Sequence, residues 1–226
     1  MKLSLSKKLL LLAIDDNKGT MISDQTHVHY GLAGAILLEM ALMEKIRIVD
    51  SRLELIASGI TKDPVMNQVI DLIKKSEKRR KIKYWVAKIG QKGDKLKKEV
   101  LKSLIHDGIL RKEESRILWI IPYNKYPTIN AKPENLVRKE LHEIVLHNKI
   151  PDQEHLMLLS LVRACKLIKE VFSRKEEYKI AKQKIKELTS DSQIGKVVDE
   201  TIQGVQAAIM IAVMTSTIAA TTVTTS

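Results

Sequence analysis

With 226 residues, of which 44% are apolar, the chain is long enough for one well-buried domain and too short for more than two. Lys and Arg outnumber Asp and Glu by 39 to 27, and the net charge of +12 favours a polyanionic partner, either nucleic acid or acidic membrane. The single cysteine, Cys165, excludes a disulfide within the chain and fits a cytoplasmic setting better than a secreted one. We predict one domain over 1–220 and a disordered Thr-rich tail at 221–226.

The order of helix signals along the chain predicts a mainly α fold. The first apolar run, Leu9 to Ile14, is too short for the core of a signal peptide. Helix starts are predicted at Asp63-Pro64, Lys132-Pro133 and Pro151-Asp152, because a capping residue or an early proline precedes an apolar periodic segment. The helix that follows Asp152 is predicted to run to Phe172 at the centre of the core, since its apolar stripe is too broad for a surface helix.

Two short β-hairpins are predicted between the helices. Apolar and polar residues alternate in Ile46 to Val49 and in Leu53 to Ile56, on either side of a polar turn. In the second predicted hairpin, Ile109 to Lys112 faces Ile117 to Ile121 across residues 113–115. The charge-free stretch 202–226 approaches the length of a membrane span. Its Gln, Thr, Ser and Ala content favours a buried closing helix over a tail anchor.

Positive charge is concentrated between Lys74 and Lys102. This segment holds 13 lysines and arginines and three acids, which is +10 of the total +12. Such a run is ordinarily a solvated helix face, but its confinement to one segment favours a binding surface. Catalytic signals are missing: His142 and His147 are five residues apart and cannot share a helix face, and there is no nucleophile elbow or phosphate-binding glycine loop. We expect no enzymatic activity, metal or cofactor.

Nucleic-acid binding remains an alternative on two signals. The segment Lys88 to Leu96, KIGQKGDKL, resembles the G-x-x-G loop with which KH domains clamp a nucleotide backbone, although a lone G-x-x-G favours a plain turn between two helices. The longer segment Lys95 to Ile121 has a basic helix, a glycine turn and a hairpin, as does the end of a winged helix-turn-helix.

Several segments together resemble the Golgi phosphoprotein 3 family. They are LLLLAIDDNKG (9–19), the G-L-x-G-x-x-L-x-E-x-A-L helix within 30–48, LKSLIHDGIL (101–110), HLMLLSLVRACKLIKEVF (155–172) and EEYKIAKQKIKEL (176–188). The resemblance implies a single compact helical domain with hairpins on one face, and a cytoplasmic protein held on Golgi membrane by phosphatidylinositol 4-phosphate. It also implies binding to the cytosolic tails of membrane proteins and self-association into a homo-oligomer. The Lys/Ile-rich composition and short N-terminal arm favour a divergent or prokaryotic member.

The resemblance carries over to particular residues only in part. The family's phosphate pocket uses a Trp before the G-L-x-G motif and an Arg inside it, and these positions read Asp24 and Ala33 here. Two further pocket arginines fall at Asp94 and Lys97, and a carboxylate there would repel a phosphate. We therefore predict a looser anionic-lipid surface formed by Lys95, Lys97, Lys98, Lys102, Arg79, Arg80 and Lys81.

In this family the tip of a hairpin is apolar and enters the bilayer, and the matching segment here is RILWIIPY, Arg116 to Tyr123. The residues predicted to insert are Ile117, Leu118, Trp119 and Ile120, since an indole suits the membrane interface. The alternative is a strand packed on the core.

Overall fold

The computed structural model describes residues 2–50, 52–117, 120–190 and 200–207, and over these ranges the chain is mostly helical. The helices are α1 (Leu5–Leu12), α2 (Gln25–Leu42), α3 (Pro64–Lys74), α4 (Ile82–Gly90), α5 (Gly93–His106), α6 (Lys132–His147), α7 (Gln153–Ala164), α8 (Ile168–Val171) and α9 (Lys175–Ser190), followed by a helix over 200–207. The strands are β1 (Ile46–Val49), β2 (Arg52–Leu55), β3 (Glu113–Ile117) and β4 (Ile121–Lys125). The prediction of a compact, mainly α fold is confirmed.

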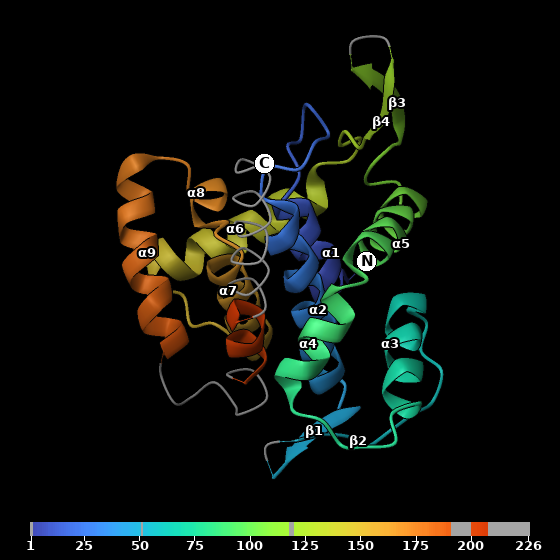
Figure 1. Cartoon of the computed structure of the whole chain (residues 1–226). Helices are drawn as coiled ribbons and strands as arrows, with labels where there is room; N and C mark the ends of the chain where they lie inside the picture. The colour runs from blue at the N-terminus through green and yellow to red at the C-terminus, as the bar shows by residue number, and fades with distance from the viewer. Residues whose placement is uncertain (1, 51, 118–119, 191–199, 208–226) are drawn as a thin grey trace, which may run out of the picture.

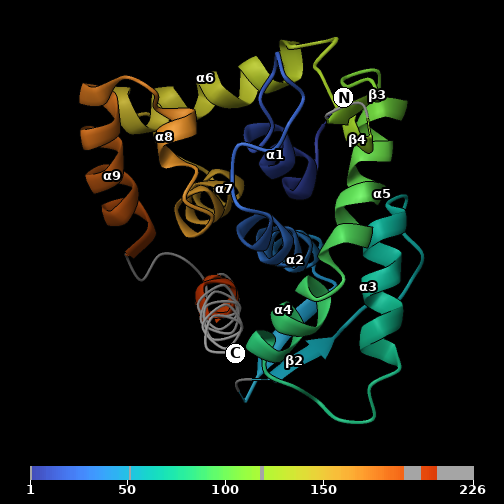
Figure 2. The same cartoon turned by 45° about the horizontal axis from the view of Figure 1, so that its top comes forward.

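Helices α1 and α2 form the centre of the molecule. In Figures 1 and 2 they lie between a group formed by α6 to α9 and a second group formed by α3 to α5. Leu9 to Leu12 are all buried, so the apolar N-terminal run belongs to the core. Across the chain, the N–H of Leu5 donates to Glu39 Oε2 at 2.5 Å. The Glu of the motif on α2 thus satisfies an N–H at the start of α1 that has no partner within its own helix.

The two glycines of the G-L-x-G motif allow helices to approach α2 closely. A Cβ on Gly31 would collide with Cys165 Sγ, and one on Gly34 would meet Val205 Cγ2 at 2.5 Å. Burial raises the pKa of the Cys165 thiol to about 12, and its Sγ donates to the carbonyl of His27 at 3.3 Å. This cysteine is therefore a packing residue, as expected of a thiol in an apolar run.

The predicted helix starts are confirmed, and one predicted helix is broken. Asp63 accepts hydrogen bonds from the N–H groups of Val65 and Met66 at 2.8 and 3.2 Å, and Asp152 caps α7 by accepting from His155 at 2.8 Å. The helix predicted to reach Phe172 ends at Ala164 and resumes as α8. Lys166, with φ of 58°, makes this break in the left-handed region, where no glycine signalled it.

The β1–β2 hairpin is confirmed, whereas the strands of the second hairpin were placed wrongly. Its strands pair Glu113 with Lys125 and Ile117 with Ile121, so residues 113–115 lie in a strand and not in the turn. Alternation predicts a strand only where one face is buried, and this ribbon has no such face among its described side chains. The two hairpins lie at opposite ends of the α3–α5 group (Figures 1 and 2).

The helix over 200–207 packs against α2 and α4. Thr201 and Val205 are fully buried, and a Cβ on Gly204 would lie 3.1 Å from the Cα of Lys83. This part of the chain closes the core, as predicted for a buried helix. No helix within the described ranges is both long and apolar enough to cross a membrane. Residues 208–226, with the predicted tail at 221–226, lie outside those ranges.

Candidate functional site

The β3–β4 hairpin projects from the body of the molecule (Figure 1). None of its described side chains is buried, and Ile120, in the loop between the strands, is 80% exposed. Leu118 and Trp119 lie outside the described residues, as does the side chain of Ile117. The predicted insertion of these three residues therefore rests on the sequence, and the structure describes only Ile120 among the four. An exposed apolar residue at the end of a free-standing ribbon is where a partner surface would first be met.

The base of this hairpin is fixed by the N-terminal loop that follows α1. The N–H of Tyr126 donates to the carbonyl of Gly19 at 2.7 Å, and that of Thr128 donates to the carbonyl of Asp16 at 3.2 Å. The Thr128 hydroxyl also donates to Asp16 Oδ1 at 3.0 Å. Gly19 has φ of +63° and lies against the backbone of Tyr126, so a side chain at this position would force the loop away from the hairpin.

A buried carboxyl beside this junction makes stability depend on pH. Burial and the Asp16 carboxylate raise the pKa of Glu134 from 4.5 to about 7, against the opposing charge of Arg138. The native state then binds more protons than the unfolded state between these values, so stability falls as pH rises from about 4.5 to 7. Over this range we expect a loss of about 1–3 kcal/mol that is missing in Glu134→Gln, measured by urea unfolding at pH 5 and pH 8. Parallel pH profiles of the two proteins would contradict this expectation.

One cation lies beside the apolar loop, and the lipid surface predicted from sequence did not include it. That cation is Arg116, which is exposed and pairs in register with Pro122, one position from the tip. Lys125 pairs with Glu113 at the base of the hairpin and lies 5.5 Å from the ring of Tyr123. Farther from the tip, Arg111 and Lys112 are neutralised by Glu113 and Glu114, at 2.6 and 3.1 Å. A signal was present in the sequence, because Arg116 immediately precedes the run ILWII.

The lysines of α5 do not form one surface as predicted. Lys95, Lys98 and Lys102 fall within about 60° of one another on a helix with 3.6 residues per turn, and all three are exposed. Lys97 points about 140° away from Lys102. Its side chain is only 13% exposed, and its Nζ lies 3.3 Å from Asp94 Oδ1. The structure thus separates Lys97 from the other three.

The positions that depart from the family's pocket are occupied in ways that do not favour phosphate. Asp24 is the N-cap of α2 and accepts from the N–H of Thr26 at 2.8 Å, while Ala33 is fully buried. Asp94 Oδ1 lies 3.4 Å from His29 Nε2. Partial burial opposes ionisation of Asp94, but His29 and Lys97 together lower its pKa below the ordinary value. A carboxylate is therefore charged where the pattern would have an arginine.

The G-x-x-G segment is a helix junction. Gly90 ends α4 beneath the ring of Tyr30, and Gly93 begins α5 beneath His29; a Cβ on either glycine would collide with these side chains. Both glycines are buried and cannot present their backbone to a nucleotide as a KH loop does. The segment is therefore the helix-to-helix turn that the sequence favoured, and the KH-loop alternative is wrong.

Arg79, Arg80 and Lys81 lie just before α4, beside β2. The N–H of Leu53 donates to the carbonyl of Arg80 at 2.8 Å, and Arg52 Nη1 donates to the carbonyl of Arg79 at 2.9 Å. They therefore lie at the β1–β2 end of the molecule, opposite the β3–β4 hairpin (Figures 1 and 2).

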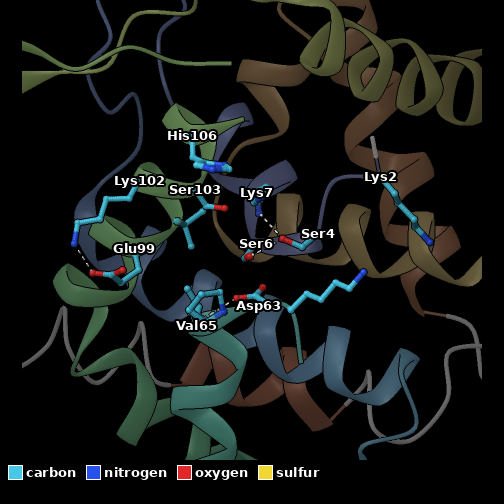
Figure 3. Close-up of a pocket in the computed structure, with 13 residues that line it drawn as sticks. Lys2, Ser4, Ser6, Lys7, Asp63, Val65, Glu99, Lys102, Ser103 and His106 are labelled. Carbon is cyan, nitrogen blue, oxygen red and sulfur yellow. Dashed lines mark hydrogen bonds and ion pairs between the residues drawn. The ribbon is translucent and has the colours of Figure 1, made fainter. Parts of the chain in front are cut away.

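A hollow of about 520 Å³ lies where α1, α3 and α5 meet (Figure 3). Its charges are largely paired: Lys102 Nζ lies 2.9 Å from Glu99, and Lys7 Nζ lies 2.6 Å from Asp107. The Asp63 carboxylate caps the N-terminus of α3 by accepting hydrogen bonds from its first N–H groups. With its charges compensated in this way, the hollow offers little net attraction to an anion.

His142 has a structural environment. His142 Nε2 lies 2.9 Å from the carbonyl of Val171, and its ring stacks on Phe172. No group of three or more His, Cys, Asp or Glu within the described ranges is arranged to hold a metal ion.

Comparison with known proteins places this arrangement in a family. The model of the family Golgi phosphoprotein 3 (GPP34) matches residues 5–205. The chain is similar to Vacuolar protein sorting-associated protein 74 of Schizosaccharomyces pombe, with 24% identity over 165 residues covering 64% of this chain and 48% of that protein. The protein of the same name from Eremothecium gossypii is 24% identical over 167 residues, or 65% of this chain and 50% of the relative. The chain spans about half the length of the curated relatives it matches, and these matches give no support to the nucleic-acid alternative.

Proposed function

Because the chain belongs to the Golgi phosphoprotein 3 family, we propose that it is a cytoplasmic peripheral membrane protein that binds anionic phospholipid and catalyses no reaction. The observation that carries the proposal is the projecting β3–β4 hairpin, with an exposed Ile120 between two strands that bury none of their described side chains. Arg116 stands beside this apolar tip and would lie near lipid phosphates when the tip is in the interface.

A second part of the proposed surface is the side of α5 that carries Lys95, Lys98 and Lys102, of which Lys102 is paired with Glu99 and contributes less than the other two. Each exposed lysine near an acidic bilayer adds up to about 1 kcal/mol of attraction. Arg79, Arg80 and Lys81 lie at the β1–β2 end of the molecule, away from the β3–β4 hairpin (Figure 1), and are not part of this proposed surface.

The proposed head-group preference is broad. Phosphatidylinositol 4-phosphate is the lipid expected from the resemblance, but Asp24 and Asp94 place carboxylates where the pattern has Trp and Arg. Binding is therefore proposed to follow total anionic charge more than head-group identity. Cytosolic tails of membrane proteins and a second copy of the chain are proposed partners on the same family basis.

The α5 surface is tested with a triple charge reversal. Lys95→Glu, Lys98→Glu and Lys102→Glu together are expected to weaken binding to vesicles with 30 mol% acidic lipid by about 100-fold or more, because three attractions become repulsions. Vesicles of equal charge made with phosphatidylserine or phosphatidylinositol 4-phosphate should bind the wild type within about tenfold of each other. Sedimentation of vesicles at fixed ionic strength measures both.

The matched control is a triple reversal on α9, at Lys175, Lys179 and Lys182. These lysines are exposed, and α9 lies on the other side of the molecule from α5 (Figure 1). The control should retain most vesicle binding while having the same net charge as the α5 variant. Equal losses in the two variants would mean that net charge alone drives binding, and the proposed α5 surface would be rejected.

A further inference from the structure

A groove with a strongly cationic lining lies at the start of α4, between β2 and the helix over 200–207. Its volume is about 490 Å³, within the range of small-ligand sites. Five cations line it: Arg52, Arg79, Arg80, Lys81 and Lys83. The other described residues that line it are Tyr84, Ala87, Gly204 and Ala207. Glu200 lines an adjoining hollow that shares Lys81 and Lys83, so the described carboxylates lie beside the groove and not in it.

Most of this charge is available to a ligand. Arg79 is the one member with a partner carboxylate among the described residues, since its Nη2 lies 2.9 Å from Glu54, which Arg47 shares at 2.7 Å. Within the described ranges, neither Lys81 nor Lys83 has an ion-pair partner. The guanidinium of Arg80 lies over the ring of Tyr84, 5.0 Å from its centre.

The cations are positioned by backbone structure on both sides of the groove. Leu53 of β2 bonds to the carbonyl of Arg80, and Arg52 bonds to that of Arg79. On the far side, Gly204 allows the helix over 200–207 to approach the backbone of Lys83. Holding like charges together raises the energy of the empty groove, and an anion with several charges relieves it.

We infer that this groove binds a small, soluble anion carrying more than one phosphate group. Guanidinium groups bind phosphate oxygens through paired N–H donors, lysines add point charges, and five cations exceed what a single carboxylate would neutralise. A soluble ligand is favoured over a lipid head group because the groove lies at the end of the molecule opposite the β3–β4 tip (Figures 1 and 2). This site goes beyond the proposed membrane function and does not depend on it.

The probe is inorganic tripolyphosphate, titrated into the full chain by calorimetry at constant ionic strength. Lys83→Glu is expected to weaken binding by at least about tenfold, and Lys88→Glu, on the same helix but outside the groove, by less than about threefold. Ala87→Phe fills the groove without changing its charge and should also weaken binding about tenfold. Thermal unfolding of each variant without ligand checks that it is folded.

Three results would overturn the inference. The first is that tripolyphosphate gives no heat of binding to the wild type. The second is an equal loss of tripolyphosphate affinity in Lys83→Glu and Lys88→Glu, which would indicate attraction to the whole basic segment.

The third result concerns vesicles. Lys83→Glu should bind acidic vesicles within about threefold of wild type. A loss as large as that from a change at Ile120 would make the groove a lipid site. Failure of the hairpin variant to affect vesicles would instead count against the membrane proposal and leave the groove untouched.

Discussion

Ile120→Asp is expected to reduce binding to acidic vesicles by at least about tenfold while leaving the melting temperature within about 1 °C of wild type. Transfer of an isoleucine side chain from water to an apolar phase contributes about 1.5–3 kcal/mol, which corresponds to roughly 10- to 150-fold in affinity. The aspartate adds repulsion from anionic lipid. Because Ile120 is 80% exposed in the free protein, the change removes little from the folded state.

Trp119 supplies an optical test of the same hairpin. The chain has two tryptophans, and Trp85 is buried with its indole N–H unpaired, so Trp85→Phe leaves Trp119 as the single reporter at small cost. Acidic vesicles should shift its emission to the blue and protect it from iodide. In vesicle sedimentation, Ile60→Asp is the control for Ile120→Asp, since Ile60 is 94% exposed and lies outside the hairpin. Emission that is already shielded without lipid, and unchanged by vesicles, would reject insertion.

Gly34→Ala is expected to lower the free energy of unfolding by about 1–3 kcal/mol, because the added Cβ would lie 2.5 Å from Val205 Cγ2 and 3.3 Å from Leu161 Cδ2. Alanine is the better helix former by up to about 1 kcal/mol, so a net loss would have to come from this overlap. The melting temperature should fall by roughly 2–10 °C, measured by calorimetry.

A double-mutant cycle isolates the contact. Val205→Ala removes the methyl group that Gly34→Ala would strike, so in that background Gly34→Ala should become neutral or stabilising. Gly59→Ala is the matched control, because nothing lies within 4 Å of a Cβ at that position. If Gly34→Ala costs the same with and without Val205→Ala, the glycine does not serve close packing between α2 and the helix over 200–207.

The sequence predicted which residues contribute to the candidate site, but not which of their side chains face the same way. The run ILWII and the lysines of α5 are visible in the sequence, yet helix geometry separates Lys97 from Lys95, Lys98 and Lys102. The wrong placement of the second hairpin has a similar cause, because alternation reports a buried face that a projecting ribbon lacks. The break between α7 and α8 could not be predicted, since Lys166 adopts a left-handed conformation without a glycine.

By itself, the sequence determined the mainly helical class, the capped starts of α3 and α7, the β1–β2 hairpin and the family, because these depend on neighbours along the chain and on patterns that survive divergence. Only the tertiary structure decided what the motif residues do. Gly31, Gly34 and Glu39 act on partners far away in the chain, at Cys165, Val205 and Leu5. The same holds for the basic segment. Its arginines before α4 lie at the β1–β2 end of the molecule, whereas its lysines on α5 lie nearer the β3–β4 hairpin, and a count of lysines in the sequence cannot show this separation.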